Sequence, residues 1–77
     1  MNIHVEFMGP VLRPTTEPSM DMTLESGATV KDLLLTLGYP ETQARHVAVY
    51  DDGVRLPHLS LLQDGQSLTV AVAMGGG

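Results

Sequence analysis

The residues with the clearest chemical potential in this sequence are the three consecutive glycines at its end, Gly75, Gly76 and Gly77. A terminal carboxylate is ionised at neutral pH and is a poor electrophile until another molecule activates it. Glycine has no Cβ, so a partner can close tightly around such a tail, and three residues reach at most about 10 Å. We therefore expect a flexible tail over residues 74–77, with the carboxylate of Gly77 as the reacting group and Gly75 and Gly76 as its passage.

A frayed chain end without any role is the alternative explanation of these glycines. Disordered tails more often mix serine, lysine and glutamate with glycine, and they rarely follow an apolar strand directly. The functional interpretation is therefore preferred. Met74, which precedes the glycines, either contacts a partner or closes the core, and the sequence does not choose between these two roles.

The other potentially reactive side chains form no recognisable site. Three histidines are scattered singly along the chain, namely His4, His46 and His58. They lack the paired spacing of metal ligands, so we expect no metal. Asp51 and Asp52 precede a glycine, which is typical of a hairpin tip rather than of a catalytic carboxylate pair. Cysteine is absent, so any sulfur chemistry would use an atom from outside the chain. We expect this domain to catalyse nothing alone.

Composition and charge limit the class of protein. Seventy-seven residues, 43% of them apolar, are enough for one domain over residues 1–77 with one thin core. A net charge of −5 would repel a phosphate backbone, which argues against nucleic-acid binding and fits docking on a basic partner. No apolar run approaches the ~20 residues of a membrane span, and the N-terminus does not resemble a leader. We expect a cytoplasmic protein that is monomeric when free.

Apolar residues that alternate with polar ones predict two strands in the first third of the chain, separated by a proline-rich loop over residues 9–18. The alternating residues are Ile3, Val5 and Phe7 in the first strand and Met20, Met22 and Leu24 in the second, which should cover residues 19–25.

One helix is predicted after the second strand. Its apolar stripe has the spacing i, i+3, i+4 and i+7 and consists of Val30, Leu33, Leu34 and Leu37. Thr29 has the position of an N-cap, with Asp32 three residues later as a capping acid. Gly38 fits a left-handed C-cap, and Pro40 prevents continuation.

Three further strands complete the predicted fold. Residues 46–50 and 54–56 flank an Asp-Gly turn, residues 58–63 are predicted as a short helical turn, and the apolar run 67–73 reads as a central strand. Two strands, one helix and three strands imply an α+β domain with one main helix on one face of a mixed five-stranded sheet. The β-grasp fold is the compact solution of this type.

Several stretches together resemble the ThiS/MoaD family of ubiquitin-like sulfur-carrier proteins. Residues 24–34 are similar to that family's junction between second strand and helix, and residues 47–53 resemble its third strand and turn. Residues 62–68 match its Leu-x-Asp-Gly-Asp-x-apolar approach to the last strand, except that Gln66 replaces the second acid. The terminal glycines complete the set, so the resemblance spans nearly the whole chain.

The resemblance implies a carrier rather than an enzyme. An adenylating enzyme of the ubiquitin-activating type would use ATP to form an acyl-adenylate at Gly77, and a sulfur donor would convert it to a thiocarboxylate. The sulfur would then pass to a thiazole synthase for thiamin, or to the large subunit of molybdopterin synthase, of which this chain would be the small subunit. In tungstopterin biosynthesis the carrier would have the same role as in molybdopterin biosynthesis. The carrier itself binds no cofactor tightly.

Two other functions stay open. A protein modifier would be joined through Gly77 to lysines of target proteins, although no basic residue precedes the glycines. A plain interaction module would not use the tail at all. The family binds its enzyme through the tail and an apolar surface patch, for which Leu59, together with Leu56, Leu61 and the open side of the first strand, is a candidate here. We expect at least two of these leucines to lie in the core instead.

Overall fold

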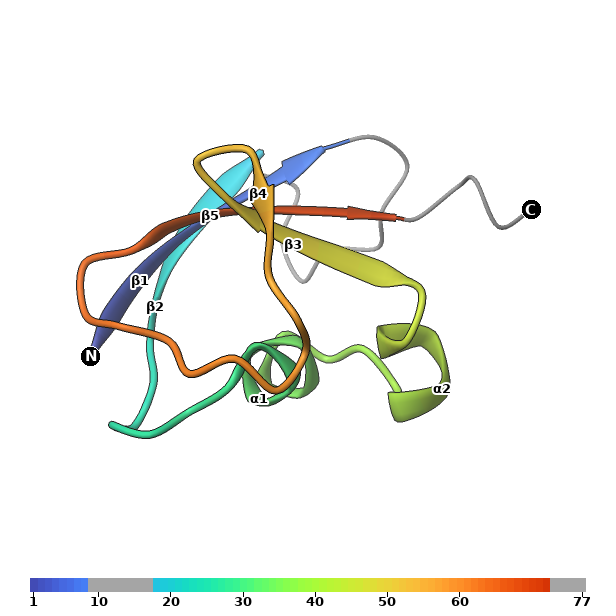
Figure 1. Cartoon of the computed structure of the whole chain (residues 1–77), viewed down its shortest axis with the longest axis horizontal. Coiled ribbons are helices and arrows are strands. Elements are labelled where there is room, and N and C mark those ends of the chain that lie inside the picture. The colour runs from blue at the N-terminus through green and yellow to red at the C-terminus, as the bar shows by residue number, and fades with distance from the viewer. Residues whose placement is uncertain (9–17, 73–77) are drawn as a thin grey trace.

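The computed structural model describes residues 1–8 and 18–72, which form five strands and two helices around a single core (Figure 1). The elements, in chain order, are β1 (Asn2–Met8), β2 (Ser19–Thr23), α1 (Val30–Thr36), α2 (Glu41–Ala44), β3 (Val47–Asp51), β4 (Val54–Arg55) and β5 (Ser67–Val72). Neither helix has the length or the apolar character that would be needed to cross a bilayer.

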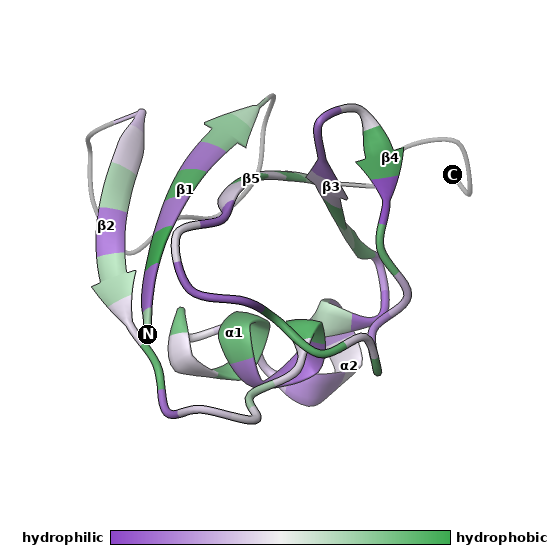
Figure 2. Cartoon of the chain, turned by 60° about the vertical axis from the view of Figure 1, so that its left-hand side comes forward, coloured by the Kyte–Doolittle hydropathy of each residue, from purple (hydrophilic) through white to green (hydrophobic). Residues whose placement is uncertain are grey.

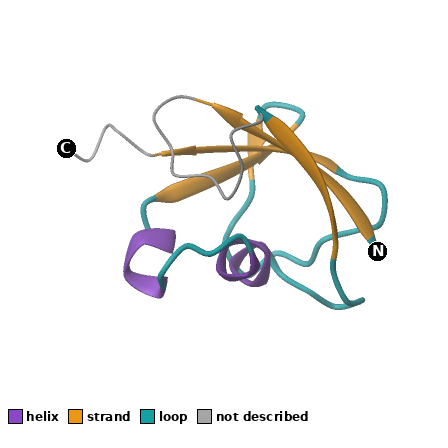
Figure 3. Ribbon diagram, turned by 180° about the vertical axis from the view of Figure 1, so that it is seen from behind, coloured by secondary structure: helices purple, strands orange, loops and turns teal. Residues whose placement is uncertain are grey.

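The five strands form one mixed sheet in the order β2-β1-β5-β3-β4. β1 and β5 are parallel, whereas the other neighbours are antiparallel. Both helices lie on the same side of this sheet, as Figures 1 and 3 show. The predicted arrangement of a mixed five-stranded sheet with one main helix on one face is therefore confirmed, and β5 is central as its apolar sequence indicated.

The core lies between the sheet and α1. The alternation along β1, visible as green and purple bands in Figure 2, buries Ile3, Val5 and Phe7 on the helix side. The stripe on α1 faces them, and β3 and β5 contribute further valines and a leucine. The fully buried larger side chains are Ile3, Val5, Val30, Leu33, Leu34, Val49, Leu68 and Val70. The apolar periods of the sequence thus predict the core correctly.

The first turn of α1 is held by the capping box that the sequence predicts. The backbone N–H of Asp32 donates to Thr29 Oγ1 at 3.3 Å, and the backbone N–H of Thr29 donates to Asp32 Oδ2 at 2.9 Å. These bonds satisfy donors that would otherwise have no partner within the helix. After the helix, Gly38 adopts a φ of 101°, a left-handed conformation that its missing side chain permits.

Replacement of Asp32 with asparagine is expected to make the stability of the domain less dependent on pH. The hydrogen bonds from Thr29 hold the pKa of the Asp32 carboxyl below its usual range. A lowered pKa in the folded state stabilises the fold above about pH 4, and this contribution disappears as the pH falls through the folded pKa. Urea midpoints measured from pH 7 to pH 2 should show that wild type exceeds Asp32→Asn near neutrality and that the gap closes in acid. A constant gap would contradict the prediction.

Two local predictions were wrong. Residues 58–63 form turns and an isolated bridge between Thr29 and Leu61 rather than a helical turn. Their carbonyls instead accept from the start of α1: Lys31 N–H donates to His58 O at 2.8 Å and Val30 N–H to Ser60 O at 3.1 Å. The short helix α2 was not predicted, because Pro40 was interpreted only as a stop signal although it is also the N-cap of α2.

Candidate functional site: the end of the sheet that leads to the tail

The predicted reactive residues lie outside the described part of the chain. This applies to Gly75, Gly76 and Gly77, and to Met74 before them. What the structure fixes is the strand that leads to them. Val72 ends β5, where Val47 at the start of β3 pairs with it on one side, and Met8 at the end of β1 pairs with Ala71 on the other. The chain therefore continues into the tail from a central strand, at the end of the sheet where β1 also ends and β3 begins.

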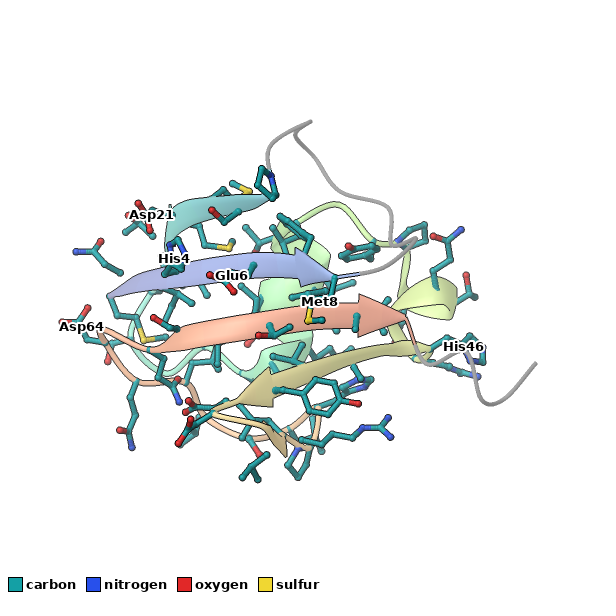
Figure 4. All side chains as sticks on the ribbon, turned by 90° about the horizontal axis from the view of Figure 1, so that it is seen from above. His4, Glu6, Met8, Asp21, His46 and Asp64 are labelled. Carbon is teal, nitrogen blue, oxygen red and sulfur yellow. The ribbon has the colours of Figure 1, made fainter. Side chains whose placement is uncertain are left out.

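The strand register arranges the open face of the sheet, opposite the helices, in rows, of which three cross the centre of the sheet and a fourth, Asn2 with Thr23, lies beyond them. The row at the tail-bearing end is apolar and consists of Met8, Ala71 and Ala48 on β1, β5 and β3. The middle row contains Glu6, Thr69 and Tyr50, and the far row contains Asp21, His4 and Ser67. Figure 4 shows His4, Glu6 and Met8 in sequence along β1 on this face. Polarity therefore decreases along the face toward the tail.

Met8 is the prominent side chain of the apolar row. It is 60% exposed, while Ala48, two strands away, is almost completely buried. The exposed apolar surface of this row is therefore made by Met8 and the half-buried Ala71, while Ala48 is packed beneath the surface. Isolated exposed hydrophobic residues are common on protein surfaces. Met8 is informative because of its position next to the last described residues of the central strand.

The polar end of the face contains a histidine between two carboxylates. His4 Nδ1 lies 2.7 Å from Asp21 Oδ1, and His4 Nε2 lies 3.8 Å from Glu6 Oε1. A carboxylate only accepts hydrogen bonds, so Nδ1 carries the proton toward Asp21. All three groups are substantially exposed, which makes this a surface interaction of small energy.

The other two histidines, His46 and His58, also have surroundings that suggest no reactive site. His58 Nε2 donates to the carbonyl oxygen of Val47 at 2.9 Å, and His46 is exposed. Within residues 1–8 and 18–72, no three metal-ligating side chains lie close enough together to hold an ion.

Asp51 and Asp52 lie at the hairpin turn, as predicted. Asp52 has a φ of 51°, and Gly53 follows it with a φ of 80°. The side chain of Gln66 joins this turn to the start of β5: its Oε1 accepts from the Gln63 N–H at 2.8 Å, and its Nε2 donates to Asp51 Oδ2 at 2.9 Å. A carboxylate at position 66 could not donate and would repel Asp51. The glutamine that departs from the resembled family is therefore matched to Asp51, a pairing that the sequence alone did not reveal.

The prediction that at least two of the three candidate leucines lie in the core was wrong. Leu59 is 78% exposed and Leu61 is 67% exposed, while Leu56 alone is partly buried against the core. The reason is that the loop meets the start of α1 through its backbone carbonyls, which leaves these two side chains outside. Leu59 is thus accessible, but it belongs to the loop beside α1 and not to the open face of the sheet.

Comparison with solved structures identifies the fold. A crystal structure of SAMP1 from Haloferax volcanii superposes with a TM-score of 0.72 at 17% sequence identity, and the match covers 100% of both chains. A second crystal structure, of H. volcanii small archaeal modifier protein 1, gives a TM-score of 0.72 at 16% identity over 92% of this chain and 95% of that one. The fold is the ubiquitin-like β-grasp. No protein-family model and no curated protein matches the sequence.

Proposed function

We propose that this chain is a ubiquitin-like modifier that is activated at the carboxylate of Gly77 and joined to amino groups of other proteins. The observation that supports this most directly is the full-length match of its fold to a small archaeal modifier protein. The sequence adds a run of three glycines after the central strand, which supplies an unbranched segment for an activating enzyme to enclose.

The proposed chemistry takes place outside the domain. A carboxylate oxygen of Gly77 attacks the α-phosphorus of ATP in the partner enzyme, and pyrophosphate leaves. The amine of a target lysine then attacks the acyl carbon, AMP leaves, and an isopeptide bond is formed. In this scheme the domain binds the enzyme while the tail reaches the nucleotide. The chain is a substrate of the reaction and not its catalyst.

A second candidate function, the sulfur carrier, is supported by the resemblance of the sequence to the ThiS/MoaD family. Its first step is the same adenylation. A sulfur nucleophile then displaces AMP and leaves a thiocarboxylate, which would be donated in thiamin or molybdopterin biosynthesis to a thiazole synthase or a molybdopterin synthase large subunit. The lack of a basic residue directly before Gly75 also separates this tail from that of ubiquitin.

Purification of the protein from its own host under denaturing conditions separates the two functions. With an N-terminal tag, a modifier yields a series of heavier adducts, and tryptic fragments of the targets carry the tail on lysine. A sulfur carrier yields unconjugated protein whose intact mass reflects the exchange of one oxygen for sulfur. Free acid alone, even after incubation with ATP, a sulfur donor and host extract, would contradict both.

We assign the docking of the activating enzyme to the apolar row at Met8. Met8→Glu is expected to weaken binding at least about fivefold, the effect of an interface residue that contributes more than 1 kcal/mol. The free energy of unfolding should change by less than about 0.5 kcal/mol, because Met8 is exposed. Leu59→Glu is the matched control, since Leu59 is exposed as well but lies on the loop beside α1. A larger loss for Leu59→Glu in the same binding assay would move the interface to that loop.

A further inference from the structure

A basic hollow lies at the β4 edge of the sheet. It has a volume of about 460 Å³ and is lined by Arg45, Arg55, Leu56, Pro57 and His58. Both arginine side chains are exposed, and no carboxylate is among the described residues that line the hollow. The two guanidinium groups are charged at all physiological pH values.

Two arginines beside one hollow are a notable concentration of positive charge in a chain that is acidic overall. The chain contains only four lysines and arginines against nine acidic residues. Of the other two cations, Lys31 is paired with Glu41 at 3.1 Å and Arg13 lies outside the described residues. Arg45 and Arg55 form no ion pair or hydrogen bond with another described side chain. Two unpaired like charges beside one hollow add nothing favourable to folding, because they repel each other.

The wall of the hollow is held in place by β3. The N–H of Leu56 donates to Val49 O at 2.8 Å, and His58 Nε2 donates to Val47 O at 2.9 Å, so residues 56–58 follow the edge of β3. Val47 also pairs with Val72, the last described residue before the tail. The hollow is therefore a fixed surface that lies one strand away from the end of β5.

We propose that this hollow is a docking site for an acidic segment of a partner protein, in which carboxylate side chains alternate with an aliphatic one. Arg45 and Arg55 would bind the carboxylates, for which the planar guanidinium is well suited. Leu56 and Pro57 supply apolar surface for the aliphatic side chain between them. The proposal goes beyond the activation of the tail and does not depend on it.

A blocked peptide of alternating glutamate and leucine is a suitable probe, because only its side chains carry charge. We expect its titration to shift the NMR signals of the Arg45 and Arg55 Nε–H groups and of the Leu56 and His58 amides. Arg45→Gln and Arg55→Gln should each weaken binding about two- to fivefold, the effect of one exposed ion pair, and the double variant about four- to twenty-fivefold if the two losses are independent. Lys31→Gln is the matched control, because it changes the net charge equally at a cation that is already paired.

Three results would overturn the proposal. An equal loss for Lys31→Gln would show that only the net charge matters. Equal binding of a glutamine-for-glutamate peptide would exclude recognition of carboxylates. Displacement of the peptide by an equal concentration of inorganic phosphate would show a small-anion site instead. Thermal unfolding midpoints of all three arginine variants should stay close to wild type, since both side chains are exposed, and this separates lost docking from lost folding.

Discussion

Deletion of Gly76 and Gly77 is expected to abolish activation of the protein altogether. The proposed reacting group is the carboxylate at the end of this glycine run, and the deletion shortens the reach of the tail by about 7 Å. The new carboxylate could not approach the α-phosphorus of ATP in an enzyme that also grips the sheet. ATP–pyrophosphate exchange with the adenylating enzymes of the host should fall to background, and covalent adducts or thiocarboxylate should disappear.

The controls for this deletion separate the tail from the fold. The free energy of unfolding should change by less than about 0.5 kcal/mol, because the described core ends with β5. Deletion of Gly77 alone leaves a tail that still ends in glycine but is about 3.5 Å shorter, so a strong loss in this variant would identify reach as the requirement. Undiminished exchange after deletion of both glycines would refute tail chemistry, and the protein would then be a plain β-grasp interaction module.

Replacement of Leu33 with alanine is expected to cause a large loss of stability. Leu33 is 0% exposed on α1 and packs in the centre of the core. Removal of a buried leucine side chain costs about 2–5 kcal/mol, because apolar contacts are lost and a cavity remains. A domain of 77 residues has a total free energy of unfolding of about 4–12 kcal/mol, so this one substitution should remove a large fraction of it and lower the urea midpoint clearly. Urea denaturation followed by circular dichroism measures the difference.

Leu35 provides the matched control for Leu33. It lies on the same helix and is 41% exposed, so Leu35→Ala removes the same atoms from the same secondary structure without opening a core cavity. Alanine also favours a helix slightly more than leucine does, and this effect is common to both variants. We expect Leu35→Ala to lie within about 1 kcal/mol of wild type. Because helix propensity favours alanine in both variants, it cannot cause a loss, and similar losses would contradict the prediction that core packing makes Leu33 the more costly leucine to remove.

Local sequence predicted the elements well where one physical rule acted alone. The alternation along β1 and the stripe on α1 follow from burying one face of each element, and the structure buries those residues. The capping box at Thr29 and the left-handed Gly38 depend only on neighbouring residues, so they too were predictable. The segment 58–63 was not, because its conformation depends on α1: its carbonyls accept hydrogen bonds from the first turn of that helix.

The features of the candidate site also divide into those that the sequence determines and those that depend on the tertiary structure. The sequence by itself determined the glycine run after a central strand, the acidic net charge and the absence of cysteine, because these are properties of composition and order. Only the tertiary structure decided which side chains lie next to the C-terminal end of β5, from which the chain continues into the tail. Met8, Ala71 and Ala48 lie in one row because strands far apart in sequence pair in a particular register. The same is true of Arg45 and Arg55, ten residues apart, which line one hollow because the chain folds back along the edge of β3.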